Sequence, residues 1–370
     1  MKKVGLVTYH NSRSYGATLQ AYATLKAIEL FGFEAEFVNY TNKYEQNTNK
    51  SKAKGLKGII GTYKNKIKAI IFNDEYYKKT AFGNNVDFYE NKVSRFYHSL
   101  TELNETDYDI LLVGSDQVWN PKITNGIDSF YFLNFGNPTR RISYASSMGS
   151  YVPTDDEKKV YKEWLEKFYK LSVREVHARK IIEEILDKDI DIVVDPTLLF
   201  SSTEWDKYLD ESVLDNCYRD IDKKYILTFF VGGKASKYIE DINYIKNVTN
   251  LPVYNIHINK HKHKGVDCVL PGVNVKEFVY LIKHAELVIT DSFHGTVFSI
   301  LYKKNFSAIS NKANPIRVIE LLKTLNLLER LDNPNCCSKN INYNSVFYQL
   351  GTLRNQSIEW LKGALLDDNK

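Results

Sequence analysis

Short apolar segments alternate with helical patterns along this chain, and this alternation is what most limits the folds open to it. Residues 3–9 form a mostly apolar run, a polar loop and a helical pattern follow, and residues 34–40 have the pattern of a second strand. The helical pattern places apolar residues on one face and Gly32 at its end. A strand, a helix and a second strand in this order indicate a parallel sheet covered by helices. The apolar face of the helix consists of Leu19, Ala23, Ala27 and Leu30.

The same alternation occurs twice. Apolar runs typical of buried parallel strands complete a first doubly wound domain. Asp195-Pro196 and a polar segment, roughly residues 201–222, then interrupt the pattern before it restarts. Further strands of the first domain are predicted at 109–115, 141–149, 171–175 and 191–196. In the second domain, strands are predicted at 224–233, 252–258, 286–290 and 305–309, with helices at 276–285, 296–304 and 315–328.

These patterns predict an α/β protein with two Rossmann-like doubly wound domains that face each other across a cleft. The domains are expected at residues 1–200 and 223–350, with a linker region at 201–222 and a C-terminal helix at 351–370. In such an arrangement the ligand site lies in the crevice at the carboxyl ends of the strands. The length of 370 residues allows each domain a hydrophobic core of its own.

Composition argues against several classes of protein. The net charge of +5 is spread along the chain and forms no dense basic stripe, so nucleic acid is not an expected partner. No apolar run approaches the length that crosses a bilayer, and residues 1–16 lack the pattern of a secretory signal. The chain is therefore expected to be cytoplasmic. Its cysteines fit neither a disulfide framework nor a zinc site: Cys217, Cys268, Cys336 and Cys337.

The most informative motif is E-L-V-I-T-D-S-F-H-G-T at residues 286–296. An apolar strand ends at Thr290 and a helix starts within a residue or two, with Asp291 or Ser292 as its cap. His294 then lies in the first helical turn, where free backbone N–H groups and the helix dipole favour a bound anion such as phosphate. A histidine that merely forms a hydrogen bond near a helix start fits the spacing equally well.

Four segments together resemble the polysaccharide pyruvyl transferase family. T-D-S-F-H-G at 290–295 resembles the family's D-x-[FL]-H signature, and residues 171–200, which begin L-S-V-R-E and contain D-P, resemble its S-V-R-E…D-P stretch. L-L-V-G-S-D-Q-V-W-N-P at 111–121 is similar to a glycine-containing turn of the family, and residues 11–20 are similar to its Asn/Gly loop before the first helix. Because the segments occur in the family's order along nearly the whole chain, chance is a poor explanation.

The resemblance implies a fold similar to the GT-B glycosyltransferases and a phosphoenolpyruvate-dependent enzyme that moves a pyruvyl group onto saccharide hydroxyls. The implied role is the biosynthesis of a surface polysaccharide (exopolysaccharide or capsule), with the first domain on the acceptor side and the second on the donor side. His294 matches the family's essential histidine and Arg174 its donor-binding arginine. Ser292 stands where many members carry an arginine, and Arg317 is placed to supply the missing charge.

Further residues are candidates for substrate binding or catalysis. Asp116, after a predicted strand, is a candidate catalytic base, although an aspartate there also caps turns. The turn formed by Gly232, Gly233 and Lys234 lets the backbone approach a phosphate, and a plain tight turn is the alternative. The remaining predicted donor-binding residues are Gly295 and Thr296, and the predicted acceptor-side residues are Asn11, Ser14 and Tyr15.

The implied pyruvyl transfer requires no metal and no cofactor beyond phosphoenolpyruvate as the donor. A metal site at His257, His261 and His263 is disfavoured because lysines alternate with these histidines. The expected acceptor is a saccharide, lipid-linked in one interpretation. Residues 49–79 are Lys-rich with an apolar stripe at helical spacing, which fits either contact with an anionic membrane surface near such acceptors or packing on the chain's own domain.

Two other functions fit the same predicted fold. A glycosyltransferase that uses a nucleotide sugar would also need phosphate contacts in the second domain, together with a base and ribose site that the sequence does not reveal. A non-catalytic glycan-binding relative would have lost part of the catalytic set. Ser292 favours this last interpretation, and the presence of Arg174 and His294 opposes it.

Overall fold

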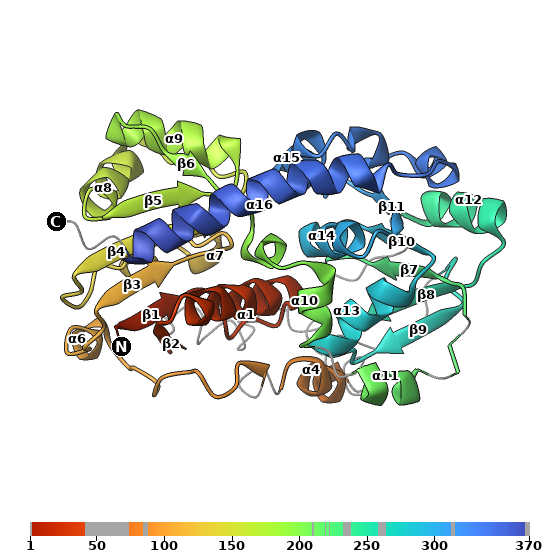
Figure 1. The fold of residues 1–370 in the computed structure, drawn as a ribbon, viewed down its shortest axis with the longest axis horizontal. Helices are drawn as coiled ribbons and strands as arrows, with labels where there is room; N and C mark the ends of the chain where they lie inside the picture. Colours follow the sequence, from red (N-terminus) through yellow and green to blue (C-terminus); the bar gives the residue numbers. More distant parts are fainter. Residues whose placement is uncertain are drawn as a thin grey trace, which may run out of the picture.

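Two parallel sheets, each covered by helices, make up the protein (Figure 1). They follow one another in the sequence, so each belongs to one half of the chain. The computed structural model describes residues 2–40, 74–83, 88–208, 211–218, 220–221, 223–231, 238–257, 264–311 and 315–366.

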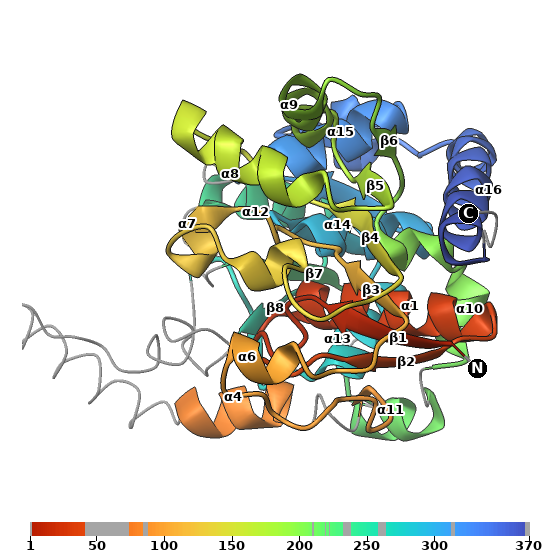
Figure 2. The same ribbon diagram turned by 90° about the vertical axis from the view of Figure 1, so that its left-hand side faces the viewer.

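The first sheet has the strand order β2-β1-β3-β4-β5-β6, and all its neighbouring strands are parallel. Separate apolar clusters cover its two faces, as a doubly wound domain requires. Figure 2 shows α1 and α16 on one side of this sheet and α7 and α8 on the other. Its strands are β1 (Lys3–Val7), β2 (Glu34–Phe37), β3 (Ile110–Val113), β4 (Arg140–Ser146), β5 (Lys170–Val173) and β6 (Asp191–Ile192).

Local capping residues start several helices of this half. At α8, Thr154 accepts the N–H of Glu157, whose side chain returns to the N–H of Thr154. The α-helices are α1 (Tyr15–Leu30), α4 (Asp74–Phe82), α6 (Leu100–Leu103), α7 (Pro121–Thr124), α8 (Asp155–Leu165) and α9 (Val176–Leu186). The described residues of this half also form two short 3₁₀ helices, η1 (Ser129–Phe132) and η2 (Pro196–Leu199).

Helix α1 lies where the sequence predicts it, but it is covered on nearly every side. Gly32, with φ of 84°, ends it as expected. The prediction that Leu30 belongs to the buried face is wrong, because this side chain is 69% exposed. Residues outside the predicted apolar stripe, such as Gln20 and Thr24, are buried instead. The reason is long-range: α13, α14 and η2 all pack against α1.

The second sheet has the order β11-β10-β7-β8-β9 and is also parallel. Sequence analysis missed β9, a half-buried edge strand that ends in proline and lacks a strongly apolar run. The strands are β7 (Ile226–Phe229), β8 (Val253–His257), β9 (Cys268–Pro271), β10 (Leu287–Thr290) and β11 (Asn305–Ala308). The helices are α12 (Ile239–Thr249), α13 (Val275–His284), α14 (Phe293–Leu301), α15 (Ile316–Thr324), η4 (Leu328–Arg330) and η5 (Pro334–Ser338).

The polar segment between the two sheets is folded onto the protein. It contains α10 (Ser202–Asp206) and α11 (Glu211–Cys217). A capping box between Ser201 and Glu204 starts α10. The same helix buries Trp205, whose ring lies 5.1 Å from that of Phe298 in α14. One large aromatic side chain thus anchors a segment whose composition predicted only a linker.

The last helix, α16 (Tyr343–Leu366), begins well before the predicted range of 351–370. Buried residues on the N-terminal side of Gly351, such as Val346 and Leu350, extend the apolar stripe of the helix, and the helix continues through Gly351 without interruption. It runs from the second half of the chain back over the first (Figure 1). There Arg140 donates a hydrogen bond to the Leu365 carbonyl at 2.8 Å.

Side chains of each domain complete elements of the other. Tyr15 of α1 stacks on Phe278 of α13 with ring centroids 4.5 Å apart, and its hydroxyl donates to the Val273 carbonyl at 2.7 Å. Helix α9 has no side-chain cap of its own. Glu320 of α15 accepts the N–H of Val176 at 2.6 Å and so caps α9 from the other domain. These contacts fix the two domains relative to each other.

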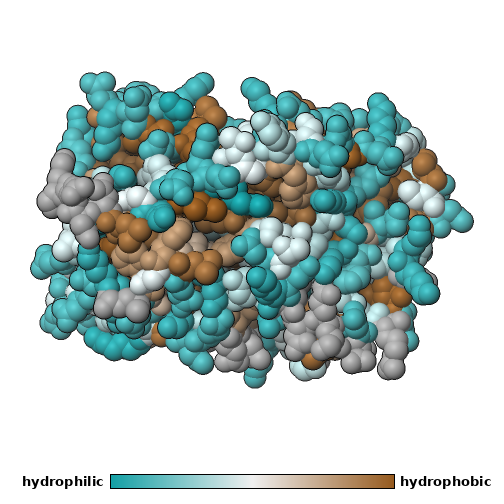
Figure 3. Space-filling model, in the orientation of Figure 1, coloured by the Kyte–Doolittle hydropathy of each residue, from teal (hydrophilic) through white to brown (hydrophobic). Residues whose placement is uncertain are grey.

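The face that carries α16 is mostly hydrophilic, with apolar side chains gathered in the middle of its left half (Figure 3). Within the described residues, no helix combines the length and the apolar character that spanning a bilayer demands.

Candidate functional site

A cavity of about 650 Å³ lies between the two domains. Its wall is formed by segments that follow strands of both sheets, as expected for crevices at the carboxyl ends of parallel strands. The wall includes residues 8–17, 116–117, 229–231, 256–257 and 292–294, together with Tyr40, Phe82, Ile123, Tyr131 and Arg317.

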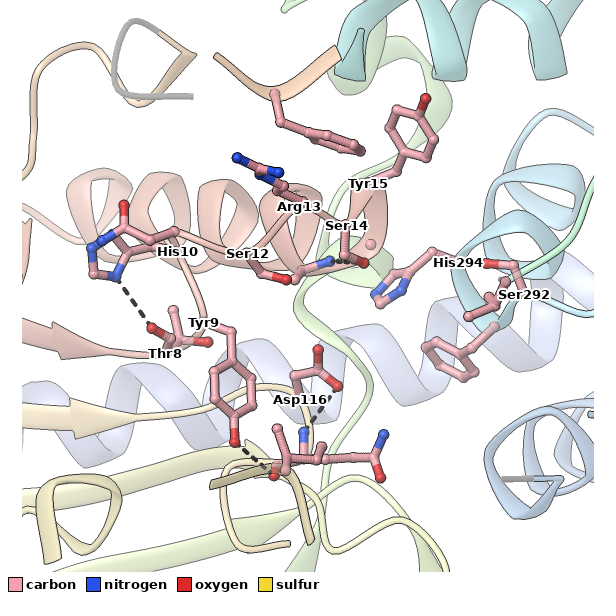
Figure 4. A pocket seen from close by; sticks show the side chains of 18 of the residues that line it. Thr8, Tyr9, His10, Ser12, Arg13, Ser14, Tyr15, Asp116, Ser292 and His294 are labelled. Carbon is pink, nitrogen blue, oxygen red and sulfur yellow. Dashed lines mark hydrogen bonds between the residues drawn. The ribbon is translucent and has the colours of Figure 1, made fainter. Parts of the chain in front are cut away.

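His294 lies at the predicted switch from β10 to α14. Ser292 is the N-cap, and its hydroxyl accepts the N–H of Gly295 at 3.2 Å. Asp291, the alternative cap, instead accepts the N–H of Val231 at 2.6 Å and the hydroxyl of Tyr238 at 3.1 Å. The imidazole of His294 points from α14 toward the loop between β1 and α1 (Figure 4). The histidine therefore reaches across the space between the domains.

The N-terminal domain encloses the His294 ring. Its Nε2 atom lies 3.5 Å from the Oδ1 atom of Asp195. A Cβ atom built on Gly16, in the first turn of α1, would lie only 2.0 Å from the Nδ1 atom of His294. Only glycine at position 16 leaves room for the imidazole in this place.

Asp195 connects His294 to Arg174. It is 1% exposed and accepts hydrogen bonds from the N–H of Thr197 at 3.0 Å and from the Arg174 guanidinium. Burial alone would raise the pKa of Asp195, but the neighbouring side chains of His294 and Arg174 lower it well below its ordinary value. This carboxylate is therefore ionised at neutral pH.

Arg174 lies beneath the cavity wall. Its side chain is 4% exposed, and its guanidinium lies 4.7 Å from the centre of the Phe293 ring. Burial would lower its pKa, but Asp195, Glu175 and Asp116 raise it, so the group stays charged. Among the described residues, its Nε and Nη2 atoms donate no hydrogen bond. These two atoms lie 3.7 Å from Glu175 and 3.8 Å from Asp116, too far for hydrogen bonds, so a closer anionic ligand could accept from them.

Arg317 reaches the same place from α15 of the second domain. Its Nη1 atom donates to Asp116 at 3.2 Å, and its guanidinium lies 5.7 Å from the Phe293 ring centre. Asp116 also lies 3.8 Å from the Nη2 atom of Arg174. Burial lowers the pKa of Arg317, while the charge of Asp116 opposes this change. The two predicted arginines thus meet at one carboxylate and one aromatic ring.

Other predicted donor-binding residues have different positions. Gly295 and Thr296 do not belong to the cavity wall that the described residues form, and the Thr296 hydroxyl donates to the Ser292 carbonyl at 3.0 Å. Their part is to build the helix start that holds His294. The predicted donor-binding residues Gly232, Gly233 and Lys234 lie outside the described part of the chain, as do His261 and His263 of the disfavoured metal site. His257, the last residue of β8, lines the cavity.

The predicted acceptor-side residues lie in the loop between β1 and α1 and at the first residue of α1. Asn11 is exposed in the cavity wall and donates to the side chain of Asn39 at 3.0 Å. Ser14 is the N-cap of α1. Tyr15 is almost fully buried and its hydroxyl is bound to Val273, so its main role is to hold the domains together. Asn11 and Ser14 remain candidates for contact with an acceptor.

An aromatic surface adjoins these polar residues. The rings of Tyr9 and Tyr131 are 4.9 Å apart, and both line the cavity. Phe82, the last residue of α4, completes the wall beside Tyr15. Aromatic faces of this kind are suited to the apolar faces of sugar rings. Most of the Lys-rich segment at 49–79 lies outside the described residues, but its last residues, 74–79, belong to α4, which ends at the cavity.

Sequence reasoning gave no role to Gly16, Asp195 or Phe293. Asp195 carried a recognisable signal, because it is a carboxylate that follows an apolar run near the edge of a parallel sheet. Gly16 and Phe293 carried none, since their neighbours belong to the other domain and lie far away in the sequence.

Solved structures of sugar-nucleotide enzymes share this fold. The UDP-GlcNAc 2-epimerase of Neisseria meningitidis bound to UDP-GlcNAc aligns with a TM-score of 0.56 and 10% identity over 100% of both chains. That of Methanocaldococcus jannaschii in complex with UDP-GlcNAc and UDP aligns with a TM-score of 0.52 and 13% identity, over 96% of this chain and 93% of that chain. For the S. aureus MnaA structure with UDP, the values are 0.53, 14%, 99% and 97%. These similarities confirm a GT-B-like pair of Rossmann-like domains.

The family assignment follows from the sequence. No curated protein matches the chain. The sequence model of the polysaccharide pyruvyl transferase family matches residues 15–313, a range that includes Arg174, Ser292 and His294. The match covers most of the chain and confirms the resemblance of the motifs. The protein therefore belongs to the polysaccharide pyruvyl transferase family.

Proposed function

We propose that the protein transfers the pyruvyl group of phosphoenolpyruvate to hydroxyls of a saccharide, within the biosynthesis of a surface polysaccharide. One observation carries the proposal: Arg317 and His294 line one cavity, and Arg174 of the other domain lies against Asp116, which Arg317 contacts, and Asp195, which faces His294. Both arginines keep buried N–H groups that no described residue accepts. Phosphoenolpyruvate offers a carboxylate and a phosphate, the groups that guanidinium forks bind best.

The reaction needs three kinds of help from the protein. A proton must reach the methylene carbon of phosphoenolpyruvate, which makes the adjacent carbon electrophilic. A sugar hydroxyl adds to that carbon and loses its proton, phosphate leaves with the C–O bonding electrons, and a second hydroxyl closes the ketal and loses its proton. The products are the pyruvyl ketal and inorganic phosphate. The protein must therefore hold two anionic groups, deliver one proton and accept two.

The residues at the cavity suit these tasks. His294 is placed to exchange a proton with the donor, and the arginines bind the donor's anionic groups. Asp116 is the carboxylate that can accept a proton from the acceptor hydroxyl. Tyr9 and Tyr131, with the polar loop at Asn11, form the side on which a saccharide would stack. Ser292 lines the cavity at the start of α14, and its hydroxyl can donate a hydrogen bond to the phosphate.

Asp116 competes with the donor for Arg317. The carboxylate already occupies the Nη1 atom of that arginine, so a bound anion must share or displace it. We expect Asp116→Asn to bind phosphoenolpyruvate about three- to tenfold more tightly, since one repulsive charge near the anion is removed. If Asp116 is the base, turnover should fall by about 10²–10⁴-fold at the same time. Isothermal titration and steady-state kinetics of this variant measure the two effects separately, and unchanged turnover would make Asp116 a counter-ion alone.

Ligand-dependent thermal unfolding tests the donor. Phosphoenolpyruvate should raise the Tm by mass action, whereas UDP-GlcNAc and UDP should not. The double variant Arg174→Gln/Arg317→Gln should lose the response, which excludes a non-specific effect of the anion. Transfer of labelled pyruvyl groups to a saccharide then tests the reaction. A Tm response to UDP-GlcNAc with none to phosphoenolpyruvate would instead indicate a glycosyltransferase that uses a nucleotide sugar.

A further inference from the structure

We infer that Gly16 and Asp195 of the N-terminal domain are positioning residues for His294 of the C-terminal domain. The effect that we infer on catalysis rests on the proposed function, but the inferred positioning of the imidazole does not. In this arrangement, the C-terminal domain supplies the imidazole and the N-terminal domain determines its position. The site is complete only when both domains are in contact.

Asp195 lies against one side of the His294 ring. Helix α14 fixes the backbone of His294, but within the described residues its Nε2 atom has no hydrogen-bond partner. The Oδ1 atom of Asp195 lies 3.5 Å from Nε2. Asp195 is itself immobilised, because both N–H and hydroxyl of Thr197 donate to it at 3.0 and 2.6 Å. A rigid carboxylate next to the ring defines one edge of its position.

Gly16 lies against the Nδ1 side of the His294 ring. The Nδ1 atom of His294 faces Gly16, where a Cβ atom would come within 2.0 Å of it and within 2.6 Å of Cγ. Contacts under 3.0 Å do not occur between real Cβ atoms and their neighbours. The backbone at Gly16 is ordinary helix, so alanine would be accepted by α1 itself. What requires glycine here is the imidazole from the other domain.

Arg174 and His294 share the carboxylate of Asp195. The Oδ2 atom of Asp195 binds Arg174, and its Oδ1 atom faces His294. One buried group therefore fixes both the donor-binding arginine and the proton-exchanging histidine. Loss of its charge should disturb both functions, whereas loss of the imidazole disturbs only one.

A double-mutant cycle in thermal unfolding tests the Gly16 contact. Gly16→Ala should lower the Tm of the native protein, because His294 has to move. In a His294→Ala background the same change should leave the Tm unchanged or raise it, since alanine favours the helix and the obstacle is gone. Gly351→Ala, inside α16 with no atom within 4 Å of the added Cβ, is the matched control and should have one effect in both backgrounds. An identical effect of Gly16→Ala in both backgrounds, or failure of the double variant to fold, would overturn the proposal.

Kinetics test the catalytic part. Gly16→Ala displaces the imidazole and leaves the arginines in place, so kcat should fall by at least tenfold while the affinity for phosphoenolpyruvate changes by less than about threefold. Asp195→Asn should lower both donor affinity and kcat. In a His294→Ala background, Asp195→Asn should weaken donor binding but should not lower kcat again. A further drop in kcat there would mean that Asp195 does not act through His294. If the native protein transfers no pyruvyl group, the proposed function fails while the thermal cycle still decides the positioning role.

Discussion

Replacing His294 with alanine should lower the rate of pyruvyl transfer by about 10²–10⁴-fold, the usual contribution of a positioned acid or base. The imidazole lies in the wall of the cavity and reaches from the start of α14 toward the opposite domain (Figure 4). Steady-state kinetics with a saccharide acceptor measure the loss. Donor affinity should change little, because Arg174 and Arg317 remain.

The structure changes what this variant should do to stability. From the sequence, trimming a first-turn residue that faces a cleft is expected to leave the fold intact. His294 is only 5% exposed and fills the space between Gly16 and Asp195, so we expect His294→Ala to cost about 1–3 kcal/mol and still to fold. Circular dichroism and chemical denaturation check this expectation.

His294→Gln separates two possible roles of the side chain. Glutamine can keep a hydrogen bond to a phosphate but cannot carry a proton at neutral pH. Its turnover should be nearly as low as that of His294→Ala. Near-native turnover in this variant would show that the imidazole binds the anion and that another group moves the proton.

Arg174→Ala should have the second large effect, on both stability and donor binding. The variant leaves Asp195 and Glu175 buried without their cation, and breaking a buried ion pair from one side costs about 3–5 kcal/mol. Loss of a charge-assisted contact should also raise the Kd for phosphoenolpyruvate at least tenfold, since such contacts contribute about 1.5–3 kcal/mol. Chemical denaturation and isothermal titration measure the two losses.

Arg317→Ala is the matched comparison for this experiment. Arg317 is 18% exposed and Asp116 is the carboxylate it contacts, so its loss should weaken donor binding with a smaller change in stability. Arg174→Lys should keep part of the stability, because the charge remains, and lose the bidentate contact. Donor binding that is unchanged in both alanine variants would move the donor site away from this cavity.

The sequence by itself determined the order of the strongly apolar strands and the helices between them, and it determined the family. Buried parallel strands such as β3 and β10 are apolar along their whole length, so they stand out from polar loops without any knowledge of their neighbours. The place of His294 followed in the same way, because the strand, the cap and the helix of this segment are all contiguous in the chain. Here local sequence and tertiary structure agree.

The tertiary structure alone decided which residues meet at the site. Gly16 lies against His294, Arg174 binds Asp195, and Arg317 reaches Asp116 from the other domain. The extent of α1 burial and the anchoring of α10 were hidden for the same reason. Periodicity and capping describe interactions between residues a few positions apart. The contacts that build the site join residues from different strands, helices or domains, so they depend on how these elements pack, and no local pattern encodes that arrangement.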